Sequence, residues 1–208
     1  MNKNKPKKKI VIIDYGMGNL KNVRNAFNFL RYDAEITGNY RHIENAAHLI
    51  LPGVGGFKDA MLTLKQKGLI EPVKDAIAGG KNFLGICLGM QLLFETSEEF
   101  GHSEGLGILK GKVIKFDEEI IPLIPHIGWN DVEILKPLKE FNGIENKSFF
   151  YFLHSYYCVP EEDIAAAVCD YYGKFSACVK KDNIFACQFH PEKSHTAGLT
   201  LLKNFINN

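Results

Sequence analysis

Short apolar runs alternate with amphipathic segments through the first half of the chain. Three apolar runs, bounded by polar or turn-forming residues, predict buried strands at residues 9–14, 48–51 and 82–86. Between and after them, apolar residues that recur every three or four positions predict helices at residues 19–30, 58–66, 69–78 and 88–95. Strands that alternate with helices in this way are typical of a mostly parallel central sheet flanked by helices.

The second half of the chain has a different pattern, with short β-rich segments separated by turn signals. The predicted strands are residues 108–116, 131–135, 148–153, 164–169, 175–179 and 184–188, and a last helix is predicted at residues 197–205. These strands predict an antiparallel β extension of the central sheet. We therefore expect a single α/β domain over residues 10–208, preceded by a flexible basic tail at residues 1–9.

Composition and charge narrow the class of protein. The chain has 208 residues, of which 46% are hydrophobic and 24% are charged, with a formal net charge of +1. This balance excludes a disordered or collagen-like chain and gives no argument for a nucleic-acid or membrane partner. The apolar run after the basic tail is too short for a signal peptide, and no stretch reaches the roughly 18 apolar residues of a transmembrane helix. We therefore expect a soluble protein of the cytoplasm.

The cysteines point to free thiols in a reducing compartment. Their number is odd and none forms a CxxC pair, so a disulfide framework is not expected. Neither they nor the seven histidines show the spacing of a metal site, so we expect no metal and no cofactor.

One cysteine lies in a motif that carries chemistry. In the segment GICLGMQ at residues 85–91, an apolar strand leads into G-x-C-x-G, the thiol counterpart of a nucleophile elbow. The glycines permit a tight strand-to-helix turn that places the sulfur of Cys87 at a helix N-terminus, where the thiolate is favoured. The amide of Leu88 then points to the place where an oxyanion would form. Gln91 and Glu95 follow at helical spacing and are expected on the same helix face as Cys87.

A second motif offers a general base for this nucleophile. In QFHPE at residues 188–192, His190 and Glu192 are two residues apart, so an extended backbone would project both side chains to one side. Pro191 favours such a conformation. The predicted arrangement is a Cys–His–Glu site for acyl transfer.

A third motif, PGVGG at residues 52–56, directly follows a predicted strand. It lacks the spacing of a phosphate-binding loop. Glycines on both sides of Val54 instead suit a loop that presents a backbone N–H to a developing oxyanion.

In this order and at these separations, the segments PGVG, GICLGMQ and QFHPE resemble those of the class I (triad) glutamine amidotransferases. The resemblance implies a flavodoxin-like α/β fold and an enzyme that hydrolyses glutamine to glutamate and ammonia. Cys87 would attack the side-chain amide of glutamine, His190 would carry the proton, and Glu192 would orient His190. The implied oxyanion donors are Gly53, Val54 and Leu88. The implied substrate-binding residues are Gly55, Gln91, His154, Ser155 and either Glu95 or Glu99.

A narrower resemblance covers nearly the whole chain. The segments IDYGMGNL at 13–20, PHIGWN at 125–130 and FLHSY at 152–156 are similar to those of glutaminase subunits of imidazole glycerol phosphate synthases. This resemblance implies a heterodimer with a (β/α)8-barrel cyclase subunit, which receives the ammonia in histidine biosynthesis. The residues expected to face that partner are Met17, Asn19, Trp129, Tyr151 and Lys193. His126 is interpreted as a plain turn residue.

Three alternatives remain open. The ending EKSH at 192–195 and the IGWN segment also resemble paralogues that feed ammonia to amidotransferases of nucleotide-activated sugars in surface polysaccharide synthesis. A non-catalytic scaffold is a second alternative, although the intact Cys87, His190 and Glu192 argue against it. A cysteine peptidase or thioesterase is a third, disfavoured by Gln91 and by the His-Pro-Glu order.

Overall fold

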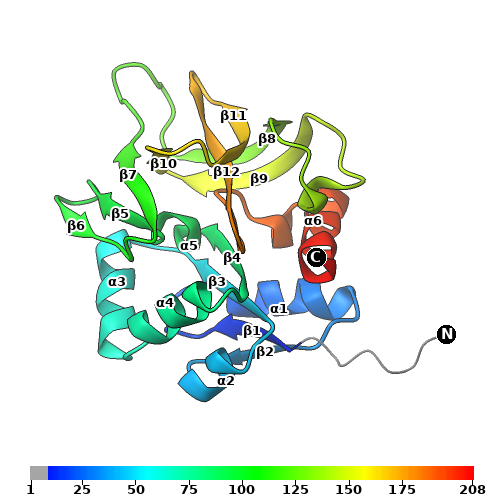
Figure 1. Ribbon diagram of the computed structural model, residues 1–208. Coiled ribbons are helices and arrows are strands. Elements are labelled where there is room, and N and C mark those ends of the chain that lie inside the picture. Colours follow the sequence, from blue (N-terminus) through cyan, green and yellow to red (C-terminus); the bar gives the residue numbers. More distant parts are fainter. Residues whose placement is uncertain (1–8) are drawn as a thin grey trace.

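A nine-stranded mixed sheet forms the centre of the computed structural model, which describes residues 9–208 (Figure 1). Its strand order is β2-β1-β3-β4-β13-β12-β11-β8-β9. The parallel part comprises β2 (Ala34–Thr37), β1 (Ile10–Ile13), β3 (His48–Gly53), β4 (Asn82–Cys87) and β13 (Ile184–Cys187). The antiparallel part comprises β12 (Lys174–Lys181), β11 (Ala165–Asp170), β8 (His126–Ile134) and β9 (Ser148–His154). The predicted fold class, a mostly parallel sheet with an antiparallel extension, is confirmed.

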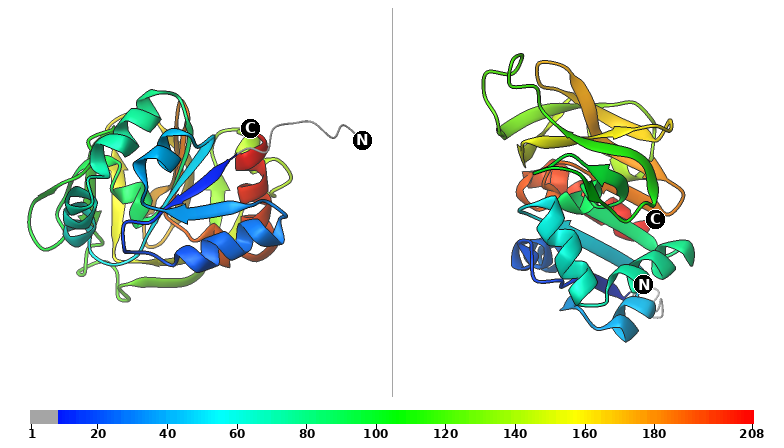
Figure 2. Two further views of the ribbon diagram at one scale, coloured as in Figure 1. Left: turned by 90° about the horizontal axis from the view of Figure 1, so that it is seen from below. Right: turned by 90° about the vertical axis from the view of Figure 1, so that its left-hand side faces the viewer.

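Helices cover both faces of the parallel strands, as Figure 2 shows. α1 (Leu20–Phe29) and α6 (His195–Asn207) pack on one face, whereas α2 (Tyr40–Glu44), α3 (Phe57–Gln66) and α4 (Ile70–Ala78) pack on the other. Side chains of β1 alternate between these layers: Ile10 and Ile12 join the first core, and Val11 and Ile13 join the second. Because β1 is buried on both sides, its apolar run is continuous rather than alternating.

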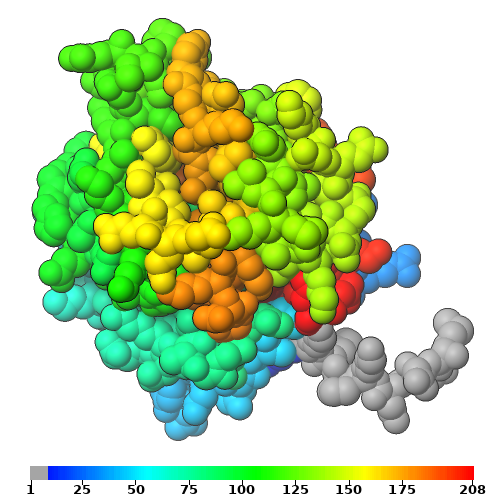
Figure 3. Space-filling model, turned by 45° about the horizontal axis from the view of Figure 1, so that its top comes forward, coloured from blue at the N-terminus to red at the C-terminus, as the bar shows by residue number. Residues whose placement is uncertain are grey.

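A second, four-stranded sheet stands beside the central one and was not predicted as a separate unit. Its order is β10 (Tyr156–Pro160), β7 (Leu109–Lys115), β5 (Phe94–Ser97) and β6 (Ser103–Glu104). β7 pairs antiparallel with β10 and parallel with β5, so the predicted strand 108–116 belongs here and not to the central sheet. In Figure 3 the green to orange segments of the second half cover the upper face of the molecule.

The predicted helix at 88–95 is wrong in its second half. The helix α5 (Leu88–Gln91) is one turn long, and the chain then enters β5. Leu92 and Leu93 are fully buried, and their carbonyls accept hydrogen bonds from the backbone amides of Leu106, Ile108 and Leu109. A continuous apolar run fits a strand as well as a helix, and pairing with β7 decides in favour of the strand.

The other differences concern short elements that were not predicted and the bounds of predicted ones. β2, α2, β5, β6 and β10 were not predicted, and β8 begins at His126 rather than at residue 131. A short 3-10 helix, η1 (Lys139–Phe141), lies between β8 and β9. The last helix spans His195–Asn207, slightly longer than predicted. Residues 1–8 of the predicted flexible tail lie outside the described residues.

Within residues 9–208, no helix is long and apolar enough to cross a membrane, and no cluster of side chains has the makings of a metal site. All five cysteines are buried and free.

Candidate active site

Cys87 occupies a strained turn between β4 and α5. Its backbone has φ 54° and ψ −113°, a left-handed conformation that is unusual for a residue with a side chain. Gly85 and Gly89 make the turn possible, since a Cβ on Gly85 would lie 2.9 Å from the carbonyl oxygen of Gly89. A Cβ on Gly89 would lie 1.8 Å from that of Leu51. The predicted nucleophile elbow is therefore present.

Cys87 is buried, with 5% of the residue exposed, and its sulfur has two polar neighbours. The Sγ–H group donates to the backbone carbonyl of Leu153 at 3.8 Å, and Sγ accepts from Nε2 of Gln188 at 3.7 Å. Both neighbours come from distant parts of the chain, at the ends of β9 and β13. The elbow therefore presents its thiol between the ends of β9 and β13.

His190 and Glu192 form the buried pair that the second motif predicts. Nδ1 of His190 lies 2.8 Å from Oε1 of Glu192, and their side chains are 2% and 1% exposed. Burial alone would lower the pKa of His190. The negative charge and hydrogen bonding of Cys87, followed by those of Glu192, outweigh burial and raise that pKa to about 10. An imidazolium is thus favoured beside Cys87.

The other ring nitrogen of His190, Nε2, is buried and has no hydrogen-bond partner of good geometry among residues 9–208. Because Nδ1 is held by Glu192, Nε2 is the atom left to interact with Cys87. The site therefore holds three groups in order: a thiol nucleophile, an imidazole that can act as acid and base, and a carboxylate that orients the imidazole.

The backbone around this pair differs from the prediction. Pro191–Lys193 forms a 3-10 helix, η2, and not an extended segment. The fixed φ of proline suits the first position of a helix, and the tight turn still brings both side chains to one side. Ser194 secures the turn, since its hydroxyl donates to the carbonyl of His190 and accepts from the amide of Tyr151 on β9.

The glycine loop lies against the elbow. Gly53 ends β3 and is the register partner of Cys87 on β4. A Cβ on Gly53 would lie 2.7 Å from the Tyr15 hydroxyl and 2.8 Å from Cβ of Leu88, so only glycine fits there. Val54 is exposed, and Gly55 has φ 100°. The predicted oxyanion donors are therefore neighbours.

Of the predicted substrate-binding residues, Gln91 lies beside the nucleophile and Glu95 does not. Gln91 is buried next to the nucleophile, with its Nε2 donating to the carbonyl of Tyr156 at 2.9 Å and to Oε1 of Gln188 at 3.1 Å. Glu95 does not share the helix face of Cys87, because it lies on β5 with its carboxylate accepting from the amide of Gly111 at 3.0 Å.

Glu99 has a different environment from Glu95. Its carboxylate accepts from the amide of Phe57, the first residue after the glycine loop. Burial raises the pKa of Glu99, opposed by the Phe57 amide and assisted by the charge of Asp59. Glu99 thus ties the segment beyond β5 to the end of the glycine loop.

His154 and Ser155 lie at the junction of β9 and β10. The carbonyl of Ser155 accepts from the amide of Phe116 at 3.0 Å. The His154 side chain is buried, and its Nε2 lies 3.1 Å from Nδ1 of His126. The interpretation of His126 as a turn residue is wrong, since it begins β8 and is buried between the rings of Phe152 and Tyr171.

Three of the predicted partner-facing residues form one cluster. The rings of Trp129 and Tyr151 lie 6.1 Å apart, and Nζ of Lys193 lies 5.3 Å from the centre of the Tyr151 ring. His195 extends the cluster by stacking on Trp129 at 4.7 Å.

Of the other two, Met17 lies beside the glycine loop and Asn19 lies at the start of α1. A Cβ on Gly55 would lie 3.0 Å from the Met17 methyl group. Asn19 caps α1, and its side chain accepts from the amide of Asn22. The capping role explains the residue type at position 19 without a partner.

Two residues of the site were not predicted as functional from the sequence. Gln188 was recognised only as a letter of the QFHPE motif, yet it contacts both Cys87 and Gln91. Tyr15 was quoted only within a motif, and its hydroxyl is buried near Gly53 without a hydrogen-bond partner in residues 9–208. Burial raises the pKa of Tyr15, and the charge of Cys87 adds to the effect. The only available signal was their position at the ends of β1 and β13.

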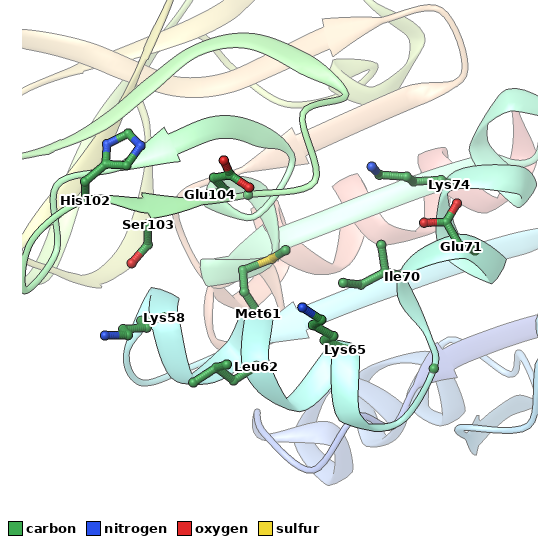
Figure 4. Close-up of a pocket in the computed structure, with 12 residues that line it drawn as sticks. Lys58, Met61, Leu62, Lys65, Ile70, Glu71, Lys74, His102, Ser103 and Glu104 are labelled. Carbon is green, nitrogen blue, oxygen red and sulfur yellow. The ribbon is translucent and has the colours of Figure 1, made fainter.

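A cavity of about 610 Å³ lies elsewhere, between α3, α4 and the β5–β6 hairpin (Figure 4). Its lining includes Lys58, Lys65 and Lys74, and Met61 and Ile70 form part of its apolar wall. None of the predicted site residues lines it. It holds no nucleophile paired with a base, so the chemistry is assigned to the Cys87 site.

The family profile described as glutamine amidotransferase class-I matches residues 11–208. The chain is 47% identical over 202 residues to the imidazole glycerol phosphate synthase subunit HisH of Syntrophotalea carbinolica, covering 94% of this chain and 98% of the relative. It is 51% identical to the subunit of the same name from Caldanaerobacter subterraneus, covering 94% and 96%.

Solved structures show the same fold at lower identity. PurLQS of Thermotoga maritima superposes with a TM-score of 0.77 at 18% identity, over 97% of this chain and 99% of that chain. A structure described as a glutamine amidotransferase gives 0.75 at 18% identity, over 95% and 97%.

Proposed function

This chain belongs to the class I glutamine amidotransferase family, and we propose that it is the glutaminase subunit of an imidazole glycerol phosphate synthase. The observation that carries the proposal is a Cys87–His190–Glu192 row, set on a nucleophile elbow, in a chain 47% to 51% identical to two such subunits over nearly their full length. Glutamine is the substrate, and the products are glutamate and ammonia.

The reaction proceeds in two halves. The Cys87 thiolate attacks the side-chain carbonyl carbon of glutamine, the C–N bond breaks, and His190 gives its proton to the leaving ammonia. A glutamyl thioester remains on Cys87. Neutral His190 then takes a proton from water as the water attacks the thioester, which releases glutamate and restores the thiolate–imidazolium pair. Glu192 holds Nδ1 of His190, so that Nε2 carries the transferred proton in both halves.

The tetrahedral intermediates carry a negative oxygen that needs backbone donors. We assign this role to the amide of Leu88 and to the backbone of Gly53 and Val54, in the loop that begins beside Cys87. Gln91 is placed to hold the amino-acid end of glutamine together with the backbone of His154 and Ser155. Of the two candidate carboxylates, Glu99 is favoured for the α-amino group, because it adjoins the glycine loop whereas Glu95 is bound to Gly111.

The ammonia passes to a partner subunit. We propose a (β/α)8-barrel cyclase as the partner in a heterodimer, with the Trp129–Tyr151–Lys193 cluster and Met17 facing it. Trp and Tyr are enriched among the residues that dominate interface affinity, and Trp129 is exposed. We place the complex in the cytoplasm, where free thiols persist.

Glutamate release by the purified chain, alone and with the barrel cyclase plus its nucleotide ligand, tests the proposal. Stimulation by a factor of ten or more by the cyclase and its ligand is expected. If a nucleotide-sugar amidotransferase stimulates hydrolysis and the cyclase does not, the glutaminase stands but the histidine pathway is wrong. No hydrolysis with either partner would contradict the proposal and favour a scaffold.

A further inference from the structure

A continuous series of hydrogen bonds connects the Cys87 sulfur to the interior of β8. It leads from Sγ to Gln188, on to Gln91, and through the carbonyl of Tyr156 to His154. His126 and Asn130 continue it on β8. Gln188 is fully buried, so its amide has no water to satisfy it and depends on these protein contacts.

The direction of each bond near the sulfur is determined. The Tyr156 carbonyl can only accept, so the group of Gln91 that faces it at 2.9 Å must be the NH2. The same NH2 faces the Gln188 amide at 3.1 Å, and the Gln188 atom there must therefore be the oxygen. This leaves the NH2 of Gln188 pointing at the Cys87 sulfur, 3.7 Å away.

The histidine branch fixes the same carbonyl from the other side. His154 donates its Nδ1–H to the Tyr156 carbonyl at 2.9 Å. Its Nε2 is therefore an acceptor, and it accepts a hydrogen bond from Nδ1–H of His126. Burial lowers the pKa of His126 to about 4 and is the main cause that lowers the pKa of His154 to about 3. Both rings are therefore neutral at neutral pH, as this pattern of donors and acceptors requires.

Asn130 closes the series. Its NH2 donates to the carbonyl of Asp170 at 3.0 Å, while its oxygen accepts from the amide of Asp131, so its orientation is determined as well. Neither Gln91 nor Gln188 can turn over without setting two NH2 groups or two oxygens against each other in a buried place. The Gln188 NH2 is thereby held toward the sulfur.

We propose that Gln188 is a positioning residue for the nucleophile: its side-chain NH2 holds the Cys87 sulfur in place and stabilises it as thiolate. The inference rests on the proposed glutaminase activity, to which it adds a residue that the triad does not include. The opposite neighbour of the sulfur, the Leu153 carbonyl, is an acceptor and favours the thiol. Gln188 is thus a neutral donor that, together with His190, offsets the preference for the thiol that the Leu153 carbonyl creates.

Alkylation of Cys87 by iodoacetamide as a function of pH tests this placement without requiring glutamine. The other four thiols are at most 1% exposed, and burial raises the pKa of Cys158, Cys178 and Cys187, so Cys87 is the reactive site. Cys87→Ala supplies the background. His190, Tyr15, Cys158 and Cys187 are the titratable groups that act on Cys87 and are unchanged in the comparison.

Gln188→Met keeps the length of the side chain and removes the donor. The pH midpoint of alkylation is expected to rise by about one unit, because a hydrogen bond to a charged group is lost. Cys178→Ala, a buried change on the neighbouring β12 that leaves the sulfur contact intact, is the matched control and should leave the midpoint unchanged. An unchanged midpoint in Gln188→Met would overturn the proposal.

Kinetics with the partner separate positioning from pocket shape. Gln188→Met should lower kcat about tenfold with KM within about threefold, because the donor contacts sulfur and not substrate. A rise in KM with unchanged kcat would overturn the proposal, since Gln188 would then act only through Gln91. If the wild-type protein proves inactive on glutamine while the alkylation midpoint shifts, the proposed function fails and the placement of Gln188 stands.

A measurement on the wild-type chain covers the case in which Gln188→Met does not fold. The side-chain 15N–1H2 signal of Gln188 should shift with pH at the midpoint found by alkylation, and this shift should vanish in Cys87→Ala. A Gln188 signal that does not respond to the state of Cys87 would overturn the proposal.

Discussion

A single added methyl group at Gly89 should disable the elbow while leaving every reactive group in place. A Cβ at this position would lie 1.8 Å from the Leu51 carbonyl oxygen, whereas ordinary contact begins at 3.4 Å. Gly89→Ala must therefore move α5 away from β3 by the difference, 1.6 Å. Because α5 starts directly after Cys87, the displacement carries the sulfur away from His190, which is anchored separately through Ser194 and β9.

The expected loss is large in activity and moderate in stability. A misplacement of about 1 Å costs about 100-fold in rate, so glutaminase kcat should fall at least 100-fold in Gly89→Ala. Overpacking of this kind costs about 1–3 kcal/mol. For a chain of this length each kcal/mol lowers Tm by about 2–4 °C, so the variant should still be folded at assay temperature.

The assay is glutamate release with saturating partner, beside thermal unfolding by circular dichroism. Gly79→Ala is the matched control: it adds the same methyl at the end of α4, where the nearest atom is the Asp75 carbonyl oxygen at 3.1 Å and φ is −74°. A Gly89→Ala protein with full activity would show that the α5–β3 contact does not set the position of the sulfur. So would an equal loss of activity in the control.

Three further changes test other parts of the site. Glu99→Gln should raise KM for glutamine about tenfold or more with little change in kcat, through loss of a charge-assisted contact, and Glu95→Gln should not; equal effects would remove the preference for Glu99. Trp129→Ala should weaken partner binding about 30-fold by calorimetry, whereas Tyr172→Ala, another exposed aromatic, should not; unchanged binding would move the interface elsewhere. Folding raises the pKa of His190 to about 10. The free energy of folding that protonated His190 contributes is therefore complete below the pKa of an unfolded histidine, and it is lost as the pH rises through about 10. Unfolding in urea should show this decline in the wild type and less of it in Cys87→Ala; parallel curves would count against the Cys87–His190 interaction.

The triad could be predicted from sequence because each part of it depends on local geometry. The elbow needs glycines two residues either side of Cys87, and His190 and Glu192 are close enough in the chain to meet in either an extended segment or a 3-10 turn. The strand–helix alternation likewise predicts a doubly covered parallel sheet, since each apolar run is buried on both faces.

What could not be predicted depends on contacts between distant segments. The helix after Cys87 ends at Gln91 because the next residues pair with β7, and that pairing removes Glu95 from the face of the nucleophile. Gln188 acquires its role only when the end of β13 meets the elbow of β4, about 100 positions away in the chain. β2 is a four-residue edge strand with one fully buried side chain, too weak a pattern to recognise.

Release of ammonia from glutamine by Cys87, for use by a separate synthase subunit, is measured with Cys87→Ala in the assembled complex. Synthesis by the barrel cyclase should be lost with glutamine as the nitrogen source and retained with an ammonium salt. Glutamine-dependent synthesis that survives in Cys87→Ala would contradict the assignment of Cys87 as the nucleophile.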